Sequence, residues 1–214
     1  MIYVMSDIHG EKERYDAMLR KIQLSDQDTL YIIGDVIDRK PYGIQILLDI
    51  MAHENMILLR GNHEQMCLDT LGRENILGAR WLWQSNGGSP TRRELLYRHT
   101  PAERNHILRY LENTPLDLTI EVNGKKFHLV HGMPGETAEQ KLWGRPEKES
   151  RSPWPDVTVI VGHTPTCLIT NDYKNPLSIW HGNGIIDIDC GCGKPTDLRR
   201  LACLCLNDMK EYYV

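Results

Sequence analysis

The sequence contains no long apolar run and no excess of basic residues. No stretch approaches the roughly 20 consecutive apolar residues of a membrane-spanning helix, and no basic, then apolar, then small-residue signal opens the chain. With 25 Lys and Arg against 29 Asp and Glu, the formal net charge is -4, whereas nucleic acids and anionic membranes favour a basic surface. We therefore expect no nucleic-acid partner, no membrane partner and a cytoplasmic location. A cleaved export signal would also remove the polar motif that begins at Asp7.

Cysteine is sparse, with six residues, but two pairs have a one-residue gap: Cys190 with Cys192, and Cys203 with Cys205. A four-thiolate zinc site is one interpretation of these pairs. On a strand, however, this spacing places both side chains on one face, and a free cysteine behaves as a small buried hydrophobe. We expect structural cysteines, with a zinc site or a redox pair as the alternatives.

The chain also lacks internal repeats and low-complexity tracts. Its 214 residues, 41% of them hydrophobic, are enough to bury one sizeable core and too few for two ordinary enzyme domains. We expect a single domain that spans residues 1–214.

The first third of the chain alternates between short apolar segments and segments of helical periodicity. Residues 2–6, 29–33 and 56–59 are the expected strands, and this alternation predicts a mostly parallel sheet covered by helices. From about residue 65 to 113 the pattern turns helical, which we interpret as an inserted helical lid at the mouth of the site.

The second half of the chain has a strand pattern again. Asn123-Gly124 lies between two apolar segments, 116–122 and 126–130, and is a strong hairpin signal. Four more strands are expected, at residues 157–161, 185–189, 201–206 and 209–213. These segments imply a second sheet.

Polar residues of metal-ligand type follow several of the expected strands. They are Asp7, His9, Asp35, Asn62, His131 and His163. Each alone has a structural explanation, since Asp after a strand often forms a turn or a helix N-cap. Together they occupy one topological position, because the carboxyl ends of strands in an open α/β sheet share one crevice. The pattern therefore predicts that these residues form a metal-binding site in this crevice.

The donor set contains oxygen and imidazole but no thiolate, which suits Mn, Fe or Zn. Two dications about 4 Å apart repel by about 16 kcal/mol at an effective dielectric constant of about 20, so a binuclear centre needs an anion between them. Asp35 is central among the candidates, and we expect it to be the bridging carboxylate.

In the order and spacing of five motifs, the sequence resembles the calcineurin-like metallophosphoesterases, and among these the bacterial serine/threonine protein phosphatases. The motifs are Asp7-Ile8-His9-Gly10, Gly34-Asp35-Val36-Ile37-Asp38-Arg39, Gly61-Asn62-His63-Glu64, His131-Gly132 and Gly162-His163-Thr164-Pro165. The resemblance implies an α/β fold with a two-sheet, β-sandwich-like core, flanking helices and a helical lid insertion.

The resemblance also implies roles for individual residues. The first metal would be bound by Asp7, His9 and Asp35, and the second by Asp35, Asn62, His131 and His163. His63, oriented by Asp38, would protonate the leaving oxygen, since an Asp–His pair fixes which ring nitrogen carries the proton.

Arg39 and Arg145 would bind the phosphoryl group, because the planar N–H donors of a guanidinium group match the geometry of phosphate oxygens. One departure is Lys40, where the family usually has Gly. This lysine would alter the loop or add a cation near the substrate.

The function implied is hydrolysis of a phosphomonoester by metal-activated hydroxide, with two divalent transition metals, manganese first and iron or zinc as alternatives. The first expected substrate class is phosphoserine or phosphothreonine in proteins, and phosphotyrosine would be a second activity. A small phosphoester is the other kind of substrate expected as a partner. A dinucleoside polyphosphate hydrolase is the alternative enzyme, although those enzymes usually lack the equivalent of Asp38. A phosphodiesterase of the same fold and a catalytically dead binding module are two further hypotheses.

Overall fold

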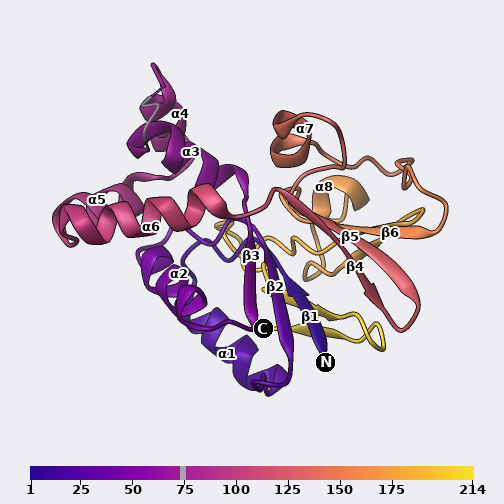
Figure 1. Cartoon of the computed structure of the whole chain (residues 1–214). Helices are drawn as coiled ribbons and strands as arrows, with labels where there is room; N and C mark the ends of the chain where they lie inside the picture. Colours follow the sequence, from indigo (N-terminus) through magenta and orange to yellow (C-terminus); the bar gives the residue numbers. More distant parts are fainter. Residues whose placement is uncertain (73–75) are drawn as a thin grey trace.

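Two five-stranded β-sheets form the centre of the computed structural model, which describes residues 1–72 and 76–214 (Figure 1). Residues 73–75, which belong to the predicted lid, lie outside the described residues. In the first sheet the strand order is β10-β9-β1-β2-β3, and in the second it is β4-β5-β6-β8-β7. No helix of the described residues is long and apolar enough to cross a membrane.

The first sheet is built by the repeated strand–helix pattern at the start of the chain. Its strands are β1 (Ile2–Met5), β2 (Thr29–Ile33), β3 (Met56–Leu59), β9 (Ala202–Cys205) and β10 (Glu211–Tyr213). β1, β2 and β3 are parallel, whereas β9 pairs antiparallel with β1 and with β10. The expected parallel unit is confirmed, and its connections carry α1 (Lys12–Ile22) and α2 (Gly43–Ala52). The expectation that the last two strands belong to the second sheet was wrong, because β9 pairs with the free edge of β1.

The second sheet begins with the predicted hairpin. Its strands are β4 (Asp117–Val122), β5 (Lys125–Val130), β6 (Val157–Val161), β7 (Trp180–His181) and β8 (Ile185–Asp187). Asn123 and Gly124 both have positive φ, 51° and 76°, as a two-residue type I′ turn requires. The two-residue strand β7 was not expected, because it is too short to show a period.

The two sheets pack face to face, and alternation along β1 divides its side chains between two apolar clusters. In β1, Val4 joins the apolar cluster between the sheets, where it meets residues such as Leu129 and Ile160 of the second sheet. Tyr3 and Met5 point to the opposite face and join the cluster under the helices. The predicted two-sheet core with flanking helices is confirmed.

The segment between β3 and β4 is helical, as predicted. Its helices are α3 (Asn62–Leu71), α4 (Ala79–Ser85), α5 (Ser89–Tyr97) and α6 (Pro101–Asn113). α3 starts at Asn62 rather than near residue 65, so the third polar motif forms the first turn of a helix. Trp83 of α4 is fully buried, whereas Trp81, two residues earlier on the same helix, is 75% exposed.

The cysteines are free thiols, and five of the six are buried in the cores. Cys203 and Cys205 lie on β9 and point into the same cluster, as strand spacing predicts. Cys190 and Cys192 lie in the loop after β8, and they enter different clusters. The expectation that both pairs share strand geometry was wrong for this second pair, because β8 ends at Asp187.

Candidate active site

The polar motifs meet where the strands of both sheets end. Asp7 follows β1, Asp35 follows β2, Asn62 opens α3 after β3, His131 follows β5 and His163 follows β6. All five side chains are buried, with at most 9% exposure. The chain therefore brings together polar groups that are widely separated in the sequence, at the edge that strand topology predicted.

Several of these residues have a left-handed backbone that is rare for residues other than glycine. The φ angles are 54° at Asp7, 49° at His9, 56° at Asp35 and 65° at His163. Such conformations cost about 1–3 kcal/mol each and cluster at functional sites. The turns after these strands are thus strained in order to aim the side chains into the shared crevice.

The first group of candidate metal-ligand atoms surrounds His9. Its Nδ1 donates to the Ile37 carbonyl at 3.1 Å, which leaves the lone pair of Nε2 facing Oδ1 of Asp7 at 3.7 Å and Oδ2 of Asp35 at 3.6 Å. This Nε2 is buried and has no hydrogen-bond partner among the described residues. An imidazole lone pair that faces two carboxylates is an arrangement that a cation would satisfy.

The second group of candidate metal-ligand atoms surrounds His131. Its Nδ1 donates to the Ile33 carbonyl at 2.8 Å, and its Nε2 lies 2.9 Å from Oδ1 of Asn62 and 3.4 Å from Oδ1 of Asp35. The Nε2 of His163 is also buried without a partner among the described residues. Candidate ligand atoms of Asp35, His131 and His163 lie within 4.8 Å of one another.

Asp35 contributes one carboxylate oxygen to each group. Oδ2 faces His9, and Oδ1 faces His131. This is the position expected of a bridging ligand. The residues present fit divalent cations, because the two groups that share Asp35 each contain an imidazole nitrogen, of His9 and of His163, that is buried without a partner among the described residues.

The electrostatics of the crevice favour neutral imidazoles at two of the histidines. Burial, reinforced by the neighbouring His131, lowers the pKa of His163 to about 3, and burial also lowers the pKa of His9. Burial would lower the pKa of His131 too, but the carboxylates of Asp35 and Asp7 outweigh it and raise that pKa to about 10. The field of the carboxylates thus attracts positive charge into the crevice.

His63 lies beside the same crevice and is held by a carboxylate. Its Nδ1 is 2.7 Å from Oδ2 of Asp38, and its Nε2 is 3.8 Å from Oδ2 of Asp35. Burial would lower the pKa of His63, but the charges of Asp35 and Asp38 raise it. The ring is therefore fixed with Nε2 facing the cluster. His63 also lies close enough to His9 and Asp35 for these three residues to form a possible group of ligand atoms.

Trp83 completes this arrangement, although none of the sequence motifs includes it. Its indole Nε1 donates to the same Oδ2 of Asp38 at 2.7 Å, from a fully buried position on α4. The backbone N–H of Asp38 donates to Oγ1 of Thr91 at 2.9 Å. α4 and α5 thereby hold Asp38 in place, and the Asp38 carboxylate in turn orients His63.

We expect Trp83→Phe to remove this donor while leaving most of the packing. A hydrogen bond to a charged group is worth about 1.5–3 kcal/mol, so thermal unfolding should occur at a lower temperature and Asp38 should hold His63 less firmly. Turnover of a phosphoserine peptide should fall several-fold, and more than turnover of para-nitrophenyl phosphate. An equal fall for both substrates at full metal content would show that Trp83 acts only through packing.

Glu64 is the second residue that the sequence left without a role. Its buried carboxylate accepts four backbone N–H groups, with distances of 2.8 Å from Asp35, 2.9 Å from Val36, 3.3 Å from Ile37 and 3.0 Å from Gly61. Burial and the charge of Asp35 raise the pKa of Glu64. This side chain ties the turn after β2 to the turn after β3. Its place three residues after Gly61, at the start of a helix, was the available signal.

We expect Glu64→Gln to destabilise the fold by roughly 1–3 kcal/mol, because the amide NH2 would face backbone donors and leave at least one of them unpaired. The matched control is Glu103→Gln, the same change at the same position of the exposed N-terminus of α6. Thermal unfolding should separate the two variants. Equal melting temperatures would contradict the role of Glu64.

The two arginines lie on different sides of the cluster. Nη2 of Arg39 is 3.3 Å from Nε2 of His63, and Nη1 of Arg145 is 3.5 Å from Oγ1 of Thr164, next to His163. Lys40 lies with its Nζ 3.6 Å from Glu11, whose carboxylate also meets Nη2 of Arg199 at 3.4 Å. Both guanidinium groups therefore border the crevice, whereas Lys40 is paired with Glu11 at its edge.

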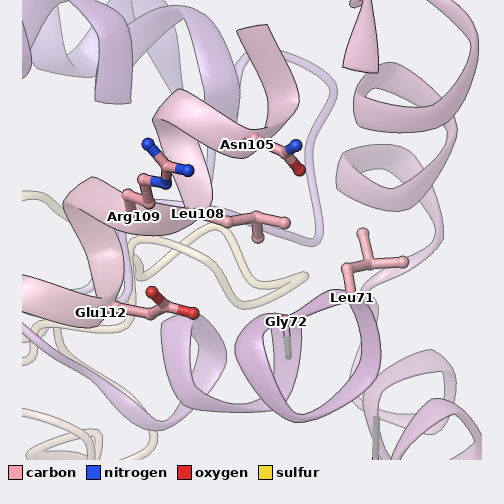
Figure 2. A pocket seen from close by; sticks show the side chains of 6 residues that line it. All are labelled: Leu71, Gly72, Asn105, Leu108, Arg109 and Glu112. Carbon is pink, nitrogen blue, oxygen red and sulfur yellow. The ribbon is translucent and has the colours of Figure 1, made fainter. Parts of the chain in front are cut away.

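A separate hollow of about 260 Å³ lies between the end of α3 and α6 (Figure 2). Arg109 and Glu112 on α6 line it, together with Leu71 of α3. None of its lining residues belongs to the polar cluster. The cluster, and not this hollow, is therefore the candidate active site.

The fold and the cluster define a class of metal-dependent hydrolases, and comparison with known proteins agrees. The family model for calcineurin-like phosphoesterases matches residues 1–189, and the chain belongs to this family. Members hydrolyse phosphoesters and usually bind two divalent metals.

Two curated relatives are similar over part of their length. One is serine/threonine-protein phosphatase 1 of Salmonella typhimurium, 36% identical over 41% of this chain and 38% of the relative. Another is the symmetrical bis(5'-nucleosyl)-tetraphosphatase of Acidovorax ebreus, 29% identical over 66% of this chain and 47% of the relative. The chain thus spans less than half the length of either relative.

Solved structures agree with the fold. A metallophosphoesterase from Sphaerobacter thermophilus superposes over 100% of this chain and 87% of its own, with a TM-score of 0.60 and 19% identity. A cold-active protein-tyrosine phosphatase from Shewanella covers 99% of this chain and 79% of its own, with a TM-score of 0.57 and 16% identity. At these identities the likeness concerns the fold alone.

Proposed function

We propose that this chain is a two-metal phosphomonoesterase that dephosphorylates phosphoserine and phosphothreonine in proteins. The observation that carries the proposal is the pair of donor sets that share Asp35, next to a histidine held by Asp38 at 2.7 Å. The first feature supports metal-dependent hydrolysis, and the second supports a substrate whose leaving group needs a proton.

The proposed ligands fall into two sets. Asp7, His9 and Asp35 would hold one divalent metal, and Asp35, Asn62, His131 and His163 the other, with manganese first and iron or zinc as alternatives. Metals bound there would supply an activated hydroxide and neutralise charge on the phosphoryl group. The chain itself supplies the buried carboxylates and imidazoles, and its hydrogen bonds to the Ile33 and Ile37 carbonyls fix the ring orientations of His131 and His9.

His63 is the proposed general acid, and Asp38 is its orienting partner. A serine alkoxide is a poor leaving group and requires protonation, whereas a phosphate leaving group of a dinucleoside polyphosphate departs without it. Asp38 holds Nδ1 and orients the ring, so that in its protonated form His63 would direct an Nε2 proton into the crevice. This Asp–His pair therefore favours an alkyl phosphoester over a polyphosphate.

Arg39 and Arg145 are the proposed phosphoryl-binding residues. Their guanidinium groups border the His63 side and the His163 side of the crevice respectively. Planar donors from two sides match the oxygens of a phosphoryl group. We further propose that residues 1–214 form one domain and that the helices within residues 65–113 act as a lid.

A dinucleoside polyphosphate hydrolase is the rival function, because a relative with that activity aligns over 66% of this chain. A side-by-side turnover assay with defined metals separates the two. Phosphoserine and phosphothreonine peptides should be hydrolysed with a higher kcat/KM than diadenosine tetraphosphate or a bis-ester. The opposite order would overturn the proposal, and no turnover of any substrate would indicate a binding module.

A further inference from the structure

An apolar cavity of about 390 Å³ adjoins the residues that follow His163. It is lined by Pro165, Cys167, Leu168, Tyr173, Leu177, Lys194, Thr196 and Leu198. These residues come from the loop before α8 (Cys167–Thr170), from α8 itself, from the loop after it and from the loop after β8. Leu168 is 50% exposed and Tyr173 is 58% exposed, so the cavity presents apolar surface to solvent.

Two walls of the cavity continue from the candidate active site. On one side, Pro165 follows His163 by two residues. On the other, Lys194 follows Gly193, whose backbone lies so close to His9 that a Cβ there would come within 2.3 Å of the ring Cδ2. A substrate with its phosphoryl group between His9 and His163 would therefore have neighbouring atoms within reach of this cavity.

We propose that this cavity binds an apolar side chain of the phosphopeptide, close in sequence to the phosphorylated residue. This inference rests on the proposed protein phosphatase activity. Burial of an aliphatic side chain against Leu168, Leu177 and Leu198 is favourable and requires no polar partner. The cavity is thus a specificity site for the residues that flank the phosphoserine or phosphothreonine.

The chemistry of the lining favours a peptide over a nucleobase. A buried base needs partners for several donors and acceptors, and each unpaired one is costly. Besides the hydroxyl of Tyr173 and the thiol of Cys167, the polar side chains among the lining residues are Thr196 and Lys194, and Lys194 is the only charged one there. Within the described part of the chain Lys194 has no ion pair, and its positive charge beside an apolar surface suits an anionic phosphopeptide.

The test uses phosphoserine peptides in which leucine or alanine occupies each of the three positions on either side of the phosphoserine. We expect wild-type enzyme to prefer leucine over alanine at one position by about tenfold in kcat/KM, the lower end of the range for an apolar pocket. Leu168→Ala and Tyr173→Ala should each reduce that ratio to about threefold or less. The ratio is measured within one enzyme, so a lower active fraction cancels.

The matched control is Leu48→Ala on α2, a leucine of similar exposure, 38%, outside the cavity; it should keep the leucine preference. Phosphopeptides hydrolysed without any preference, or a preference that both cavity variants retain, would overturn this inference and leave the proposed function intact. If no phosphopeptide is hydrolysed while diadenosine tetraphosphate is, and the cavity variants change its KM, both proposals fail and the cavity binds a nucleobase.

Discussion

Asp35→Asn is expected to weaken metal binding at both sites at once. The substitution keeps the size of the side chain but removes the charge of the carboxylate, whose two oxygens face His9 and His131 separately. Loss of an outer-sphere partner already costs 10- to 100-fold in metal affinity, so loss of a shared ligand charge should cost more than about 10²-fold. Turnover at limiting metal should fall at least as far.

The comparison variant is His163→Ala, which removes a candidate ligand of the second set only. Metal titration should show one weakened site in this variant and two in Asp35→Asn. The circular dichroism and melting temperature of both proteins establish that they are folded. If Asp35→Asn weakens one site and leaves the other unchanged, Asp35 is not the bridge.

His63→Ala is expected to slow phosphoserine hydrolysis far more than aryl phosphate hydrolysis. A general acid contributes about 10² to 10⁴ in rate when the leaving group needs a proton. Serine leaves as an alkoxide, whereas nitrophenolate departs nearly unaided. Turnover of a phosphoserine peptide should therefore fall by about 10²- to 10⁴-fold, and turnover of para-nitrophenyl phosphate distinctly less.

Two controls are needed to interpret this result. Metal content must be equal in wild type and variant, because a lost metal would slow both substrates alike. Asp38→Asn should show the same difference between substrates more mildly, since it disturbs the hydrogen bond to Nδ1 without removing the ring. Equal slowing of both substrates by His63→Ala, where chemistry limits both rates, would assign His63 to phosphate binding or positioning instead.

The sequence alone could predict that Asp7, Asp35 and His163 converge, because each follows an expected strand and the carboxyl ends of such strands lie at one edge of a sheet. An apolar segment such as 29–33 identifies a strand, and a parallel arrangement brings Asp35 to the same edge as Asp7. The same reasoning extended to the second sheet and His163. These inferences need only the strand period and the rule that strand ends share a crevice.

Contacts that depend on helix packing could not be predicted in this way. Trp83 reaches Asp38 only because α4 packs at one particular angle, and no local pattern separates Trp83 from the exposed Trp81 two residues earlier. Cys190 and Cys192 have strand spacing but follow the end of β8. The spacing of residues reports secondary structure, whereas the direction of a loop side chain depends on tertiary contacts.

The measurement that tests the binuclear centre most directly is elemental analysis of purified protein after reconstitution with manganese and removal of excess metal. The two donor sets around Asp35 predict two metal ions per chain in the wild type. A stoichiometry that never exceeds one, with manganese, iron or zinc, would contradict the binuclear centre on which the proposed function rests.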